Sequence, residues 1–317
     1  MTFLEAAAAV DGFLLRLNRP LQYAVIGATV LLMIATAIPN VPRAYVDYAR
    51  FPLLSGIRQY ETHGTDTIGA EYGAKVVLND PLDMYTRERL EQTPLEAATW
   101  TREQSAPYPP ASLLTSAALY AIGTATGIEF YGMVLLLAAL FVGLSLWYFL
   151  KTRWYLFPLL YLNFEYFGHR FVYVQDGTYL AMLVVVMVAL VLARSRHQAS
   201  HLLMALATTM KLSPAAYARE ILTMRRGTAI VFAAILFAGF VLPYFIWDSY
   251  LTIFTFHDQI KGNIYDTLAA VLLVVPFTLV LWYVETRLGF DLEDRIGWSL
   301  VPFAMSSASR CGWPGIC

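Results

Sequence analysis

Residues 131–150 read YGMVLLLAALFVGLSLWYFL, a run of twenty positions without one charged side chain. A helix of about 20 apolar residues is what the hydrocarbon core of a bilayer requires. Further apolar runs of similar length occupy residues 21–38, 178–193, 228–247 and 268–283. The sequence therefore predicts an all-α integral membrane protein.

The composition agrees with a membrane protein. Hydrophobic residues make up 58% of the 317-residue chain and charged residues 14%, whereas soluble domains carry roughly 25% charged residues. The net charge is −1 and no basic stripe or tail is present, so nucleic acid is not an expected partner. We expect a single transmembrane domain over residues 1–317, a helical bundle of about 7–10 membrane segments, some of them re-entrant.

The basic residues predict the orientation of the chain. Arg16 and Arg19 precede the first apolar run, and Arg194 follows the run at 178–193. Basic residues gather on the cytoplasmic side of a membrane, so we expect a multi-pass protein of the plasma (inner) membrane with a cytoplasmic N-terminus. Residues 1–20 mix charged and apolar side chains and predict an amphipathic helix at the membrane interface. Residues 42–110 then form a long extracytoplasmic loop.

This outward loop carries the first candidate site residues. Asp47 stands at the mouth of the first span, where restricted water raises the pKa of a carboxyl toward that of a general base. An ordinary solvated acid, paired with Arg43 or Arg50, is the alternative reading of Asp47. Asp66, further along the loop, is an alternative acid. The loop closes with Tyr108 and two prolines, just as the chain becomes hydrophobic again.

Four more polar residues are candidates for substrate binding. Lys211 interrupts an apolar stretch in the sequence KLSP, and a lysine at the membrane centre costs about 2.5–3.5 kcal/mol on insertion scales. It therefore needs an anion such as a lipid-linked phosphate, unless it extends to the interface. His169 and Arg170 can bind phosphate, and Gln175 can hydrogen-bond a sugar hydroxyl; the alternative is a polar turn that caps the next helix. No metal motif is evident, so neither a metal nor another cofactor is expected.

Several sequence elements, taken in their order along the chain, resemble those of the polyprenol-phosphate-dependent glycosyltransferases of the GT-C type. The nearest resemblance is to the bacterial phosphatidylinositol-mannoside mannosyltransferases. The matching elements are Asp47 after the first span, the turn at 80–85 (DPLDMY), the element at 106–110 (APYPP), and the pair VQDG at 174–177 and KLSP at 211–214. The chain departs from the pattern at Val174, where the family has Gly, at Gly177, where it has Asn, and in lacking Tyr in the KLSP element.

The resemblance implies a multi-span GT-C helical bundle and a sugar transferase. Such an enzyme moves a sugar, mannose-like by resemblance, from a polyprenyl-phosphate donor to a lipid or glycan acceptor on the outer face of the membrane. It implies Asp47 as general base, Lys211 with His169 and Arg170 at the donor phosphate, and Tyr108 and Gln175 as positioning residues. Membrane lipids and a membrane-protein partner complete the expected partners. The alternatives are a non-catalytic membrane subunit that keeps the GT-C frame and, less favoured, a lipid or solute transporter.

Overall fold

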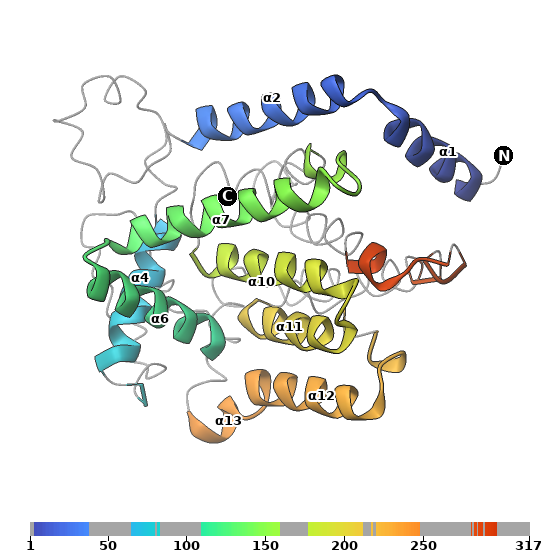
Figure 1. The fold of residues 1–317 in the computed structure, drawn as a ribbon. Helices are drawn as coiled ribbons and strands as arrows, with labels where there is room; N and C mark the ends of the chain where they lie inside the picture. The colour runs from blue at the N-terminus through green and yellow to red at the C-terminus, as the bar shows by residue number, and fades with distance from the viewer. Residues whose placement is uncertain are drawn as a thin grey trace, which may run out of the picture.

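The computed structural model is helical throughout the part of the chain that it describes, and no strand occurs there. The described residues are 3–37, 65–79, 81–82, 109–158, 177–211, 217, 220–247, 280, 282–283, 285–287 and 289–296. The prediction of an all-α fold is confirmed for these residues. Figure 1 shows the arrangement of the labelled helices.

Four helices lie side by side in a row, in the order α7, α10, α11 and α12 (Figure 1). Their bounds are α7 Phe130–Phe149, α10 Gly177–Ala193, α11 His197–Met210 and α12 Arg226–Phe240. Most residues of α10 are buried, whereas Phe232 is the one buried residue of α12. Because α10 is packed on several sides, its uniformly apolar sequence is what a central helix requires.

A short connection turns the chain back from α10 into α11. The amide of Arg196 donates to the carbonyl of Leu192 at 2.6 Å, and α11 begins at the next residue. A connection of this length makes neighbouring helices antiparallel. The hydroxyl of Ser200 donates to the carbonyl of Ala189 at 2.8 Å, which joins the two helices inside the core. Small side chains on both helices, such as Ala189 and Ala207, allow this close approach.

The expected loop at 42–110 contains a helix, α4 (Thr65–Asn79), which packs against α6 (Pro110–Thr126). Ala74 and Val77 are buried between them, and Ala70 is buried as part of the main core. They recur at the spacing of one helix face, while Lys75 and Glu71 form an ion pair of 2.8 Å away from that face. Residues 65–79 are therefore a packed part of the fold, within the segment that was expected to be a polar loop.

The apolar run at 228–247 is divided in the structure. Helix α12 ends at Phe240, and a short helix α13 (Pro243–Ile246) follows. Pro243 has no amide hydrogen and cannot continue the hydrogen-bond ladder of α12. The run was expected to be one membrane segment, and the proline accounts for the division.

The N-terminal part forms two helices, α1 (Phe3–Arg16) and α2 (Arg19–Ala37). The helix predicted over residues 1–20 thus corresponds to α1 and the start of α2. The indole of Trp154 donates to the carbonyl of Leu14 at 3.0 Å and holds the end of α1 against the turn that follows α7.

Within the described residues, α7 is the one helix long and apolar enough to cross a membrane, with 20 residues and a mean hydropathy of 2.1. Of the most apolar stretch of α7, 28% is buried against the rest of the protein. Helices α10 and α12 are also apolar but shorter. A single helix of this kind also occurs in the cores of soluble proteins. The fold therefore establishes the all-α class, and the bundle of several membrane spans stays a prediction from the sequence.

The contact between α11 and α12 yields a stability prediction at Gly239. A Cβ added there would overlap Cγ2 of Thr209, a side chain that is 3% exposed. We expect Gly239→Ala to lower the free energy of unfolding by about 1–3 kcal/mol, because the buried threonine must shift. Gly227→Ala in the same helix is the control, since nothing lies within 4 Å of its Cβ position. Thermal unfolding in detergent measures both, and equal melting temperatures would contradict the packing argument.

Candidate functional site

Three chain segments meet at the end of the row where α10 begins. The hydroxyl of Ser116 lies 2.9 Å from that of Thr178, which joins α6 to α10. The hydroxyl of Ser112 donates to the carbonyl of Met210, which joins α6 to the last turn of α11. Two of the sequence elements singled out above, the end of VQDG and the start of KLSP, are therefore neighbours in space, and α6 connects them.

Lys211 is the predicted site residue that the structure describes in full. It follows the last residue of α11 with an extended backbone (φ −152°, ψ 135°), and its amide donates to the carbonyl of Ala207 at 3.2 Å. Its side chain is partly buried, and Nζ lies 5.2 Å from the centre of the Tyr179 ring. The ring is 1% exposed. A cation over a buried aromatic face is attracted by about 0.5–2 kcal/mol, more as water is excluded.

The element APYPP ends at the first turn of α6. Pro110 is the first residue of this helix, where a missing amide hydrogen costs nothing. The carbonyl of Pro109 accepts the amides of Ser112 at 2.9 Å and Leu113 at 3.3 Å. The prolines therefore start the helix whose Ser116 contacts the start of α10 and whose Ser112 contacts the end of α11.

The turn that follows α4 also lies near the start of α6. The indole of Trp247 donates to the carbonyl of Pro81 at 3.1 Å. Trp247 packs against the cluster of Ala74, Val77 and Leu113, which lies between α4 and α6. Segments that carry four of the sequence elements, at residues 81, 109–110, 177 and 211, thus gather around the start of α6.

Gly177 departs from the Asn that the resemblance predicts, and the packing gives a physical reason. A Cβ at this position would lie 2.9 Å from Cγ2 of Val134 in α7. Because α7 approaches the first residue of α10 so closely, the position has no room for an asparagine side chain. The departure is a packing feature at the edge of the candidate site.

For the other predicted site residues, the structure describes no side chain. Asp47, Tyr108, His169, Arg170 and Gln175 lie outside the described residues. Asp66 lies within α4, but its side chain is outside the description as well. Among the residues that the structure describes, no group of three or more His, Cys, Asp or Glu side chains is arranged to hold a metal ion.

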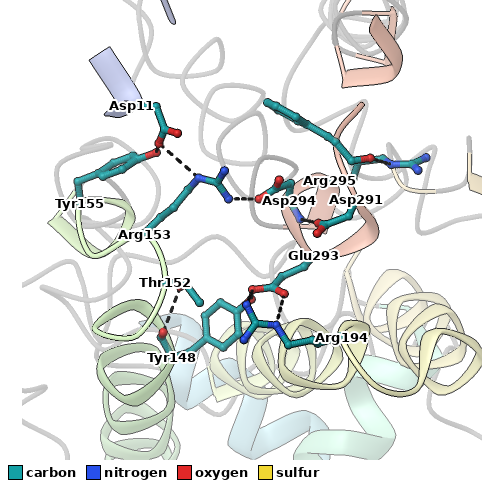
Figure 2. A network of polar contacts seen from close by, with 11 residues as sticks. Asp11, Tyr148, Thr152, Arg153, Tyr155, Arg194, Asp291, Glu293, Asp294 and Arg295 are labelled. Carbon is teal, nitrogen blue, oxygen red and sulfur yellow. Dashed lines mark hydrogen bonds and ion pairs between the residues drawn. The ribbon is translucent and has the colours of Figure 1, made fainter. Parts of the chain in front are cut away.

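A polar network that sequence reasoning missed occupies the opposite end of the row (Figure 2). Arg153, in the turn after α7, lies between two carboxylates: its Nε is 3.4 Å from Oδ1 of Asp11, and Nη1 pairs with Asp294. The hydroxyl of Tyr155 donates to Asp11. Burial, and then the hydrogen bond to Asp11, raise the pKa of the Tyr155 phenol, so this hydroxyl stays protonated and remains a donor.

The second half of the network centres on Glu293. The hydroxyl of Tyr148 donates to this carboxylate, and Nε of Arg194 lies 2.9 Å from its Oε2 (Figure 2). Together the two halves tie α1, the ends of α7 and α10, and residues 291–296 into one assembly. The two arginines pair with three carboxylates, and these contacts join separate parts of the chain, so we interpret this end as a structural junction.

A buried ion pair beside this junction yields a second stability prediction. Nη1 of Arg295 lies 3.0 Å from Oε2 of Glu220, whose side chain is 1% exposed. The hydroxyl of Thr223 donates to the same oxygen at 2.9 Å. Removing one partner of a fully buried pair costs roughly 3–5 kcal/mol. Because Arg295 is itself partly exposed, we expect Arg295→Met to lower the free energy of unfolding by about 2 kcal/mol.

Arg194→Met is the matched control for this prediction, because Arg194 also pairs with a glutamate but its side chain is 72% exposed. We expect it to change the melting temperature little. The double variant Glu220→Leu/Arg295→Met should recover much of the stability that Arg295→Met loses. If Arg194→Met and Arg295→Met proved equally stable, burial would not be the source of the effect.

Comparison with known proteins found no matching family model, no similar curated protein and no similar solved structure. The geometry of the chain itself must therefore support any statement of function. That geometry places the partly buried cation of Lys211 over the ring of Tyr179, close to the positive end of the α10 helix dipole. Such an arrangement favours a negatively charged ligand.

Proposed function

We propose that this chain is a membrane glycosyltransferase of the GT-C type. It transfers a sugar from a polyprenyl-phosphate donor to a lipid or glycan acceptor. The observation that supports the proposal most is the gathering of Pro81, Pro109, Gly177 and Lys211 around the start of α6. These positions belong to separate sequence elements, and a shared substrate site gives them a reason to meet.

The surfaces of the outer helices support a location in the membrane. The exposed side of α7 carries Leu136 and Leu140, and that of α12 carries Ile230 and Phe237. Large apolar patches of this kind are uncommon on soluble monomers and fit a lipid environment. Nζ of Lys151, just beyond α7, lies 4.6 Å from the centre of the Trp147 ring, a pairing suited to the edge of a bilayer.

The distribution of basic residues supports the orientation proposed here. Arg153 pairs with Asp294 and Arg194 pairs with the adjacent Glu293, so both arginines lie at the network end. The hydroxyl of Thr228 pairs with Gln198, so α12 starts beside the start of α11, also at the network end. Lys211 lies at the opposite end, after the last turn of α11. We assign the network end to the cytoplasm and the Lys211 end to the outer face.

The chemistry of the proposed reaction needs one base and one site of positive charge. Asp47 takes the proton of the acceptor hydroxyl, whose oxygen attacks the anomeric carbon of the sugar with inversion. The bond from that carbon to the phosphate oxygen breaks, and the phosphate leaves with the electron pair. Lys211, with His169 and Arg170, stabilises this charge, so no general acid is required. Gln175 and Tyr108 orient donor and acceptor.

Sugar transfer in proteoliposomes tests the proposed function. The purified full-length chain is reconstituted with a panel of polyprenyl-phosphate sugars and with extracted membrane lipids as acceptors. We expect a radiolabelled sugar to enter the acceptor fraction, and empty vesicles to show none. Failure of every donor would contradict the enzyme proposal and leave the non-catalytic subunit as the better description. Movement of the donor across the bilayer without transfer would support a transporter.

A further inference from the structure

Helices α11 and α12 are neighbours in the row (Figure 1) and run parallel to each other. The hydroxyl of Thr228 donates to the side chain of Gln198 near the start of both helices. Near their other ends, Gly239 packs against the side chain of Thr209. Contacts between first turns and between last turns are those of parallel helices, so the start of α12 lies beside the start of α11.

Four exposed basic side chains stand at these two helix starts and are called the basic patch: Arg196, His197, Arg225 and Arg226. Neither helix has an acidic residue in its first turn or a side chain that caps it. In the part of the chain that the structure describes, no ion pair joins the three arginines to a carboxylate. The positive ends of two helix dipoles add to their charge. The basic patch therefore complements an anion.

An exposed apolar stripe of α12 continues directly from the basic patch. Ile230 lies one turn beyond Arg226 on the same face of the helix, and Phe237 lies two turns further along that face. Their side chains are 69% and 52% exposed, and Ala233 and Ala234 between them are exposed as well. The stripe is about 16 Å long at 1.5 Å per residue. This length is close to half of the hydrocarbon core of a bilayer, which is about 30 Å thick.

We propose that the basic patch and the apolar stripe together bind an anionic phospholipid of the cytoplasmic leaflet. The arginines contact the headgroup phosphate, because a guanidinium group presents several donors to its oxygens. The acyl chains lie along the stripe, whose length matches one leaflet. Two adjacent helix starts concentrate the charge at one place, which distinguishes a site from the general excess of basic residues on this side. The proposal rests on the membrane location and orientation given above and does not depend on sugar transfer.

Lipid binding by the purified full-length chain in detergent tests the proposal. Phosphatidylglycerol and phosphatidylcholine with the same acyl chains are titrated, and native mass spectrometry counts the bound lipids. We expect phosphatidylglycerol to bind more tightly. The double variant Arg225→Gln/Arg226→Gln should lower its affinity about 25-fold, roughly fivefold for each cation lost, and leave that of phosphatidylcholine unchanged. Equal affinities of the wild-type chain for the two lipids would overturn the inference.

The matched control is Arg16→Gln/Arg19→Gln. Both arginines are exposed, stand at helix ends and lie outside the basic patch. We expect the affinity for phosphatidylglycerol to change by less than about twofold, because charges beyond a Debye length are screened. Equal losses in the two double variants would indicate diffuse surface charge and would contradict a localised site. Since all four substituted side chains are exposed, melting temperatures should match that of the wild type.

Inorganic phosphate, added to the wild-type chain, distinguishes a lipid from a free anion. Phosphate carries the charge but has no acyl chains, so an equal concentration should leave phosphatidylglycerol bound. Displacement of the lipid by phosphate would assign the basic patch to a free anion and refute the lipid as occupant. The lipid titration is read without a sugar donor, so its failure and the failure of sugar transfer are separate results.

Discussion

Asp47→Asn is expected to lower the rate of sugar transfer by roughly 10²–10⁴-fold, the contribution of a positioned general base. Asparagine has nearly the same shape as aspartate but cannot take a proton from the acceptor hydroxyl. The acceptor must then attack as a neutral alcohol, a far weaker nucleophile. The initial rate of transfer in proteoliposomes measures the effect, with donor and acceptor both saturating so that the change reports on the chemical step.

Asp66→Asn is the control for Asp47→Asn, because both acids lie within residues 42–110, the segment that the sequence predicts to face outward. We expect Asp66→Asn to retain nearly the full rate. Helix α4 carries Asp66, so its melting temperature is compared with that of the wild type before rates are interpreted. A large loss in Asp66→Asn with activity kept in Asp47→Asn would transfer the role of base to Asp66. Full activity in both variants would contradict base catalysis by either acid.

The helices of the core were predictable from their apolar runs. The run at 131–150 is shifted by one residue from α7, and the run at 178–193 begins one residue after the start of α10. The division of the run at 228–247 was also open to prediction, because Pro243 cannot take part in an unbroken helix. The proline was overlooked because the run was judged by its overall hydrophobicity over 20 residues.

Helix α4 was missed because residues 42–110 were judged by their polarity as a whole. The buried positions 70, 74 and 77 follow the period of a helix face. That pattern was visible in the sequence beside the charged residues of the opposite face. Short amphipathic helices are obscured by polar neighbours when a window is chosen for membrane segments of about 20 residues.

The polar network was beyond sequence reasoning. Arg153 contacts Asp11 and Asp294, which are 142 and 141 positions away along the chain. No spacing rule relates such positions, because only the packing of α1 and residues 291–296 on the end of α7 brings them together. Lys211 was identified by the cost of an interior charge, but its aromatic partner depended on the antiparallel turn from α10 to α11.

Lys211→Met is expected to lower the rate of sugar transfer by about 10²–10³-fold, the usual cost of removing one group that stabilises developing negative charge. Methionine keeps much of the length and apolar surface of the lysine stem, so packing beside Tyr179 is largely retained. The loss should appear in kcat as well as in KM for the donor. The phosphate is charged in the bound donor and gains a further negative charge as its bond to the sugar breaks.

Two further variants give the loss at Lys211 a specific meaning. Lys211→Arg should recover part of the rate, because the charge remains while the planar guanidinium group fits the ring and the phosphate differently. Lys151→Met removes a lysine that also lies over an aromatic ring, at 4.6 Å from Trp147, but at the opposite end of α7. It should leave the rate unchanged. Equal losses in Lys151→Met and Lys211→Met would indicate a general effect of charge at the membrane surface. A loss confined to Lys211 would assign the leaving phosphate to the end of the bundle where α6 and α10 begin.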